Sequence, residues 1–184
     1  ILLSYPMPGK KEPTATKKVT AKKAAPKKAA PEAEMEKVEK EKSILVRKLD
    51  NSGVAVLNND DERVRKMSKE TKSRVLTYGF SESSQIRARE LSLNLNGDKV
   101  DGLRFKITYE GSTVPIYMPN VIGQAVVYAA LAGAAVGAVY GLNLVEISQA
   151  LKNFKPPQGR LNLISGIKGT LIIDDTYNSF RRYA

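Results

Sequence analysis

Residues 54–79, VAVLNNDDERVRKMSKETKSRVLTYG, decide the fold. The stretch opens with a short apolar run, continues as a charged segment of helix-forming residues, and ends in a second strand-like run. A strand, a helix and a strand in one such span predict a βαβ unit with parallel strands. The polar cluster 58–61 follows the first run, where a parallel strand ends at a functional edge. We expect Asp60 or Asp61 to cap the helix that follows.

The flanking segments extend this unit in both directions. Helix-forming residues with a few apolar members predict a helix over about 32–49. Strand-length runs follow between 85 and 119, with turn signals at 96–98 and 110–111. Apolar and polar residues alternate in the middle run, which is typical of an antiparallel meander with one buried face. The fold class is therefore α/β, with a parallel sheet and a small antiparallel meander.

An uncharged stretch, 119–145, is long enough to span a bilayer, and Gly133, Gly137 and Gly141 have the spacing of closely packed membrane helices. Ala and Gly dominate it, however, and no basic residue flanks it closely. We favour a helix packed under the sheet, with the glycines at points of close backbone approach. An amphipathic helix capped by Asn143 should follow.

The segment KPPQGR, 155–160, has the composition of a domain hinge, and a new sheet is expected beyond it. Asp174 and Asp175 end an apolar run there, so their oxygens could accept from ribose hydroxyls or hold Mg²⁺. A strand-end turn with solvated acids is the equal alternative. Arg160 at the hinge could contact a phosphate in bidentate fashion.

Composition excludes several mechanisms. The 184 residues carry a net charge of +11 and contain neither Cys nor His, which removes disulfides, thiol nucleophiles, Cys/His zinc sites and imidazole bases. Residues 1–31 are rich in Lys, Ala and Pro and are expected to be a disordered linker. The alternative is a basic arm that neutralises the phosphates of nucleic acid, and we favour the linker because no aromatic residue is interleaved for stacking.

Five ordered blocks point to a known family: EKVEKEKSILVRKLDNSGVAVLNNDDERV, RVLTYG, GQAVVYAALAGAAVGAVYGLNLVEISQAL, FKPPQGRL and LIIDDTYNS. In order and spacing they resemble the Mur ligase family of peptidoglycan synthesis, and DDTYNS is most similar to the branch that adds D-alanyl-D-alanine. Beyond the linker at 1–31, the resemblance implies part of the ATP-binding central domain at 32–156 and the first strands of a Rossmann-like C-terminal domain at 157–184. The chain is thus expected to be an internal fragment.

The resemblance also implies an activity and its residues. The activity is that of a cytoplasmic, ATP-dependent amide ligase that forms an acyl phosphate on a UDP-muramoyl-peptide, which an amino acid or D-alanyl-D-alanine then attacks. Lys42 matches a lysine that is carbamoylated in the family and helps to place Mg²⁺. Arg160 matches the hinge arginine that contacts the ATP phosphates. Asp175, with Asp174 and Asn178, matches the nucleotide-binding residues.

Three positions depart from the family pattern. Ala125, Val126 and Ala129 stand where the family has a His-Asn pair and a later Asn that bind adenine. No phosphate-binding loop of the Walker type occurs, so we expect residues 1–184 alone to be inactive. The alternative function is a non-catalytic module of degenerate ligase fold with a basic arm for nucleic acid or another polyanion.

Overall fold

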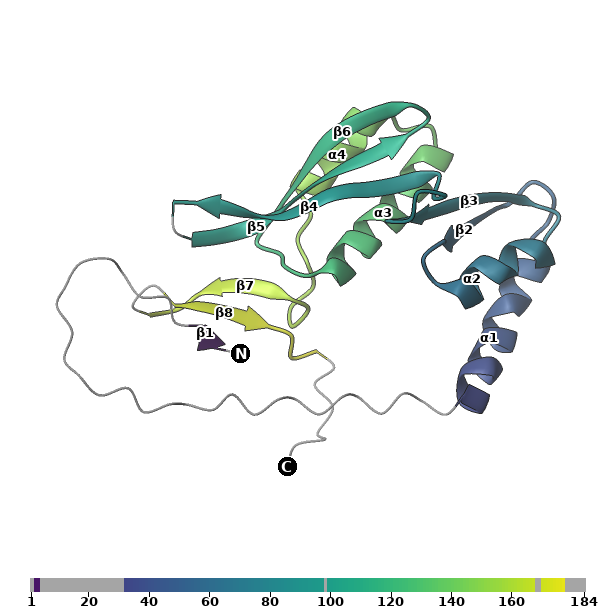
Figure 1. Ribbon diagram of the computed structural model, residues 1–184, viewed down its shortest axis with the longest axis horizontal. Helices are drawn as coiled ribbons and strands as arrows, with labels where there is room; N and C mark the ends of the chain where they lie inside the picture. Colours follow the sequence, from purple (N-terminus) through teal and green to yellow (C-terminus); the bar gives the residue numbers. More distant parts are fainter. Residues whose placement is uncertain (1, 4–31, 98, 168–169, 178–184) are drawn as a thin grey trace.

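A computed structural model describes residues 2–3, 32–97, 99–167 and 170–177 (Figure 1). Its main body is a five-stranded sheet in the order β2-β3-β4-β5-β6, and a small antiparallel sheet has the order β1-β8-β7. This arrangement confirms the predicted α/β fold class. The main strands are β2 (Val54–Asn58), β3 (Arg74–Gly79), β4 (Ile86–Asn96), β5 (Lys99–Tyr109) and β6 (Ser112–Pro119).

The βαβ unit forms as predicted. β2 pairs in parallel with β3, with Val54 opposite Arg74, and the crossover contains α2 (Glu62–Lys66) and the 3₁₀ helix η1 (Met67–Glu70). α1 (Glu32–Arg47) precedes the unit, close to the predicted 32–49, and packs against η1. β3 also pairs in parallel with the start of β4, so this half of the sheet is parallel.

The other half is the predicted meander. β4 pairs antiparallel with β5, and β5 with β6. Leu103, Phe105 and Ile107 on β5 are at most 2% exposed, while Arg104 and Lys106 between them are exposed. This alternation produces one core face and one solvent face, as a period of two residues requires.

Two apolar clusters pack the sheet against the helices. The larger one lies between the sheet and the helices α3 (Gln124–Val139) and α4 (Leu144–Lys152), with Leu76, Ile107 and Leu131 fully buried in it. The smaller one joins Ala55 and Leu57 of β2 to Met67 of η1. β2 is therefore covered on both faces, which explains its nearly continuous apolar sequence.

The long uncharged stretch forms α3, whose 16 residues span about 24 Å, less than the roughly 30 Å of a bilayer core. None of the described helices has the length and apolar character needed to cross a membrane. The prediction about its glycines was wrong at two positions. A side chain at Gly133 or Gly141 would meet open space, and Gly141 instead has the positive φ, 86°, of a helix end. Gly137 does face close neighbours, the side chains of Leu142 and Ile147.

α4 begins with the predicted cap. The Asn143 side chain accepts hydrogen bonds from the backbone N–H groups of Val145 and Glu146. In return the Glu146 carboxylate accepts a hydrogen bond from the Asn143 N–H, which completes a capping box. Beyond α4, the new sheet contains β7 (Asn162–Ser165), β8 (Leu171–Asp174) and β1 (Leu2–Leu3). Apart from β1, the predicted linker lies outside the described residues, and the domain boundaries at 31/32 and 156/157 stay predictions.

Candidate functional site

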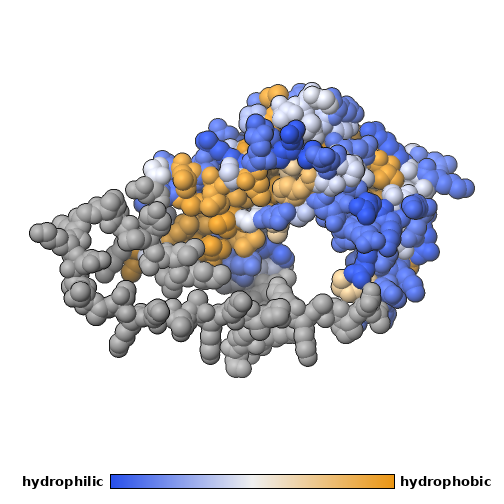
Figure 2. All heavy atoms as spheres, viewed as in Figure 1, coloured by the Kyte–Doolittle hydropathy of each residue, from blue (hydrophilic) through white to orange (hydrophobic). Residues whose placement is uncertain are grey.

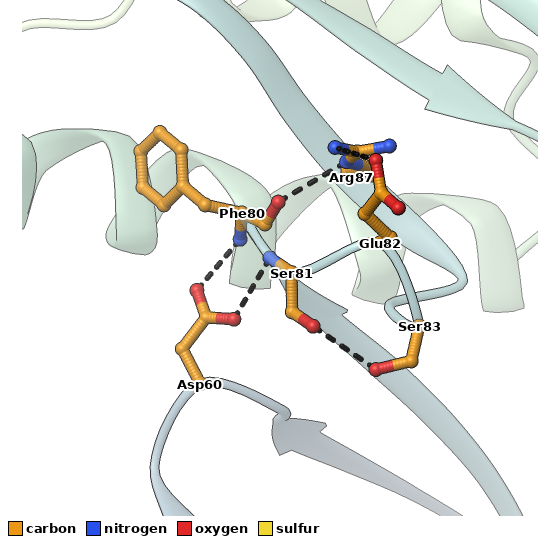
Figure 3. A network of polar contacts seen from close by, with 6 residues as sticks. All are labelled: Asp60, Phe80, Ser81, Glu82, Ser83 and Arg87. Atoms are coloured by element: carbon orange, nitrogen blue, oxygen red, sulfur yellow. Dashed lines mark hydrogen bonds and ion pairs between the residues drawn. The ribbon is translucent and has the colours of Figure 1, made fainter.

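The carboxyl ends of β2 and β3 meet at a tightly bonded edge built around Asp60 (Figure 3). Asp60 Oδ2 accepts from the Phe80 N–H at 2.6 Å, and Oδ1 accepts from the Ser81 N–H at 2.9 Å. The hydroxyl of Tyr128 on α3 donates to Oδ2 at 2.9 Å. One carboxylate therefore joins the end of β2, the loop after β3 and a helix of the facing layer.

Its neighbours are fixed as well. The rings of Phe80 and Tyr128 meet edge to face, with centroids 5.2 Å apart. Burial, together with the Asp60 carboxylate, raises the pKa of Tyr128 above its ordinary value. Arg87 Nε donates to the Phe80 carbonyl at 3.1 Å, and its Nη2 lies 3.1 Å from Glu82 (Figure 3). The loop after β3 is thus held from both sides.

Asp61 caps α2, which confirms the prediction that Asp60 or Asp61 does so. Its Oδ1 accepts from the N–H groups of Arg63 and Val64 and so caps α2. Asp60, the other candidate, does not cap the helix. Its partners lie 20, 21 and 68 residues away along the chain, and helix-start patterns contain no signal for such contacts.

An open cleft of about 640 Å³ lies beside this edge, between α1, α2 and α3, and includes Asp60, Asp61 and Tyr128. Its basic residues are already paired: Arg63 with Glu39 at 3.6 Å, and Lys66 with Glu62 at 3.0 Å. The bond from Lys66 lowers the pKa of Glu62. Figure 2 shows hydrophilic surface over α1 and α2. In the part of the chain that the structure describes, no three acidic side chains converge as a metal cage would require.

A second polar cluster joins the hinge to the end of β8. Asp174 Oδ2 accepts from the Gly159 N–H at 3.1 Å, and the Tyr177 N–H donates to the Gly159 carbonyl at 3.0 Å. Gly159 is buried with φ 75°, and a Cβ there would lie 2.7 Å from the Tyr177 nitrogen. The structure therefore requires glycine at this position, next to Arg160.

Arg160 is exposed, and its guanidinium carbon lies 4.1 Å from the centroid of the Tyr177 ring. Stacking of this kind occupies the face of a guanidinium and leaves its N–H edges available. Asp175 is exposed too, and among the described residues nothing donates a hydrogen bond to its carboxylate. Asn178, the last of the predicted binding residues, lies outside the described residues.

The start of α3 adjoins this hinge cluster. Val121 forms an isolated bridge with Asn162, and the Leu163 N–H donates to the Asn120 carbonyl at 3.1 Å. A Cβ on Gly123 would lie 3.1 Å from the Leu161 side chain. Ala125 and Ala129, in the first turns of the helix, are exposed and apolar.

Lys42 stands apart from these residues. It is exposed on α1, and within the described ranges it has no hydrogen bond or ion pair. α1 and the strands β7 and β8 lie at opposite sides of the molecule in Figure 1. The structure thus brings Arg160, Asp174 and Asp175 into one region and leaves Lys42 in another. Sequence analysis missed Tyr177 as the partner of Arg160, because no short motif signals a stacked pair 17 residues apart.

Comparisons with known proteins agree with this architecture. The UDP-N-acetylmuramate--L-alanine ligase of Alkaliphilus metalliredigens is 30% identical over 129 residues, 70% of this chain and 27% of the relative. The UDP-N-acetylmuramoyl-L-alanyl-D-glutamate--2,6-diaminopimelate ligase of Bacillus cereus is 29% identical over 140 residues, 73% of this chain and 27% of the relative. The chain therefore spans about a quarter of the length of such relatives.

Solved structures show the same fold. A crystal structure of MurF from Acinetobacter baumannii has a TM-score of 0.67 at 24% identity, over 78% of this chain and 30% of that one. The MurF ligase of Thermotoga maritima, crystallised with ADP, has a TM-score of 0.66 at 21% identity, over 78% of this chain and 31% of that one. The family model of the Mur ligase middle domain matches residues 33–137, more than half of the chain. This chain belongs to the Mur ligase family, through its middle domain.

Proposed function

We propose that the chain forms part of an ATP-dependent amide ligase of peptidoglycan precursor synthesis. In this reaction a carboxylate oxygen of the UDP-muramoyl substrate attacks the γ-phosphorus of ATP, giving an acyl phosphate and ADP. An amine then attacks the acyl carbon, inorganic phosphate leaves, and an amide bond forms. Membership in the family supports the reaction class. The observation that carries the proposal within this chain is the hinge cluster of Arg160, Asp174 and Tyr177.

The residues of this cluster suit different parts of a nucleotide. Arg160 would bind the ATP phosphates through its free N–H edges, since guanidinium groups bind phosphate in bidentate fashion. Asp175, which is exposed, would accept from the ribose hydroxyls. Asp174 would act indirectly, because its bond to Gly159 holds the loop that carries Arg160. We assign Asn178 to the same site by resemblance alone.

The adenine contact differs from the family pattern. Ala125 and Ala129 are exposed at the start of α3, next to the hinge, and Val126 is half-buried. These side chains offer an apolar surface against which an adenine ring can pack, but no hydrogen bond. We therefore propose that the phosphates and the ribose contribute most of the nucleotide affinity, and that discrimination between purine bases is weak.

Mg²⁺ fits the described residues poorly as they stand. No acidic cage is present among them, and the Lys42 ammonium repels a cation. A carbamate on Lys42 would supply oxygen ligands instead, and the exposed amine is accessible for that modification. We propose Lys42 as the residue that would hold Mg²⁺ in carbamoylated form. In this structure α1, which carries Lys42, lies at the opposite side of the molecule from β7 and β8, so an ion held there would not contact phosphates bound at Arg160.

The proposed substrates are a UDP-muramoyl-peptide and either an amino acid or D-alanyl-D-alanine. The similarity of the fold to MurF structures and the DDTYNS run support the dipeptide. The names of the sequence relatives, an L-alanine ligase and a diaminopimelate ligase, support a single amino acid. We also propose a cytoplasmic location, where ATP and nucleotide-linked precursors are available.

Calorimetric titration with ATP and Mg²⁺ tests the proposal. We expect Arg160→Ala and Asp175→Ala each to weaken binding at least tenfold, which corresponds to about 1.4 kcal/mol. Lys155→Ala removes a neighbouring exposed charge of the hinge and serves as the control, with an expected change below about twofold. If the chain ignores ATP and binds nucleic acid with a steep salt dependence, the alternative of a non-catalytic polyanion-binding module is correct.

A further inference from the structure

The meander has a hollow of about 400 Å³ that the proposed function does not use. It lies between strands β4–β6 and helix α4. Polar side chains from four elements line it: Glu90, Ser92, Arg104, Lys106, Tyr117, Ser148 and Lys152. We call this hollow the meander groove.

The meander groove is positively charged. Lys106 is neutralised by Glu90, whose Oε2 lies 2.6 Å from its Nζ. Arg104 and Lys152 have no carboxylate within ion-pair distance in the part of the chain that the structure describes. The guanidinium of Arg104 lies over the Tyr117 ring, 5.8 Å from its centroid. The further acid beside Tyr117, Asp101, accepts a hydrogen bond from Asn94. Two cations of the groove are therefore available to a ligand.

The backbone of β4 is irregular beside the groove. Arg89 is opposite Lys106, and Ser92 is opposite Arg104, so β4 contains one residue more than β5 between these two pairs. Glu90 in this bulge has φ 53°, a value that is unfavourable for residues other than glycine. Arg89 opposite Lys106 is also a like-charge pair, which destabilises a sheet.

The bulge at Glu90 changes which side chains line the groove. Bulges redirect side chains and are common next to functional sites. Without the extra residue, the alternation of β4 would place Ser92 on the core face, and here it lies opposite Arg104 on the solvent face. The bulge also brings Glu90 to Lys106, where it offsets one of the clustered positive charges. The strained segment thus shapes the groove.

We propose that the meander groove binds the phosphate groups of a small soluble molecule. Arg104 offers planar N–H donors, Lys152 offers an ammonium, and Ser92 has a hydroxyl without a partner among the described residues. These are the donors that phosphate oxygens accept from. The volume is in the range of small-molecule sites. A concave hollow favours a compact anion over a flat lipid surface.

Calorimetry with inorganic pyrophosphate at low salt tests this proposal on the whole chain. The double variant Arg104→Gln, Lys152→Gln should bind pyrophosphate at least tenfold more weakly than the unsubstituted chain. The matched control Lys69→Gln, Lys99→Gln removes the same charge from exposed positions outside the groove and should change affinity less than about twofold. Lys152→Gln alone, in the last turn of α4, provides a variant that leaves the sheet untouched, with an expected loss of about threefold.

Two further measurements separate this site from other anion sites. Arg160→Gln should leave groove binding unchanged, and pyrophosphate should shift amide resonances of β5, β6 and α4. The proposal is overturned if the chain shows no saturable binding, if the control loses as much affinity as the double variant, or if the shifts map to the hinge. Binding to phosphatidylserine-containing vesicles without binding to pyrophosphate would also overturn it and assign the face to a lipid surface.

Discussion

Two strands of this molecule end in the same way, and their acidic pairs have different roles. β2 runs into Asp60 and Asp61, and β8 runs into Asp174 and Asp175. In the first pair both carboxylates are occupied, one by two backbone amides and a tyrosine hydroxyl, the other by the start of α2. In the second pair, among the residues that the structure describes, only Asp174 accepts hydrogen bonds, from the hinge glycine and from Thr176.

The difference teaches how to separate structural from functional acids. A carboxylate that accepts bonds from fixed backbone donors stabilises the fold and has little capacity left for a ligand. An exposed carboxylate that accepts no hydrogen bond from the described residues, such as Asp175 next to Asp174 of the hinge cluster, has that capacity. We call the end of β2 the first edge and the end of β8, with the hinge, the second edge. We therefore expect substitution of the acids at the first edge to reduce stability, and substitution of Asp175 at the second edge to reduce ligand binding.

The largest effect should come from Gly159, which holds the second edge together. Alanine there would carry a strained φ of 75° and meet the Tyr177 nitrogen, at a cost of at least about 2 kcal/mol. Hydrogen exchange of the Tyr177 amide should become about 30-fold faster. Gly111→Ala is the matched control, because its φ is 77° and a Cβ there would meet nothing within 4 Å. Equal exchange rates in the two variants would contradict the packing described here.

The next largest effect is the difference in stability loss between Asp60→Ala and Asp175→Ala. Asp60→Ala removes the acceptor of three hydrogen bonds, two of them from backbone amides, and should lower the free energy of unfolding by about 1–2 kcal/mol. Asp175→Ala removes an exposed carboxylate and should change it by less than about 0.5 kcal/mol. Urea unfolding of both variants measures the difference. A larger loss in Asp175→Ala would reverse the assignment of the two edges.

A smaller effect sharpens the contrast within the first pair. Asp61→Ala deletes the cap of the five-residue helix α2 and should cost about 1 kcal/mol. Asp61→Asn keeps an acceptor oxygen and should recover most of that loss. Urea unfolding again provides the measurement. If the two substitutions cost the same, the negative charge and not the hydrogen bond would be responsible.

The smallest effect concerns Glu90, which lies at neither edge. The hydrogen bond from Lys106 lowers its pKa in the folded chain below the ordinary value of 4.5. Its contribution to stability is therefore present above that value and is lost as the pH falls through the folded-state pKa. Glu90→Gln should be less stable than the unsubstituted chain at pH 7, and the difference should disappear once the pH lies below the folded-state pKa of Glu90. A difference that persists at the lower pH would show that the ion pair is not its cause.

Local chemistry made much of the fold predictable. The βαβ unit follows from two apolar runs around a charged helix, and the meander follows from alternation and turn residues such as Gly111. The Asn143 cap follows from an amide three residues before a glutamate. The two prolines of the hinge predict a break in the chain, and the apolar run before Asp174 predicts a strand of a new sheet beyond it.

Contacts between distant residues were not predictable from such patterns. The bond between Tyr128 and Asp60 spans 68 residues, and no local pattern marks it. The β4 bulge is different, because the apolar positions change from Ile86 and Ala88 to Leu91, Leu93 and Leu95, and this shift of the alternation at Glu90 is visible in the sequence. Gly133 fits the spacing of a packed helix, yet the face on which it lies is open. Periodicity indicates which residues share a face, but only the assembled layers determine what that face contacts.

The central claim is that the nucleotide binds at the second edge and not at the first. Mapping of amide resonances during titration of the chain with ATP tests it most directly. We predict shifts at Arg160, along 174–177 and in the first turn of α3, and none at the Asp60 edge. Shifts confined to Phe80, Ser81 and α2 would contradict the claim, because they would place the nucleotide in the cleft beside Asp60.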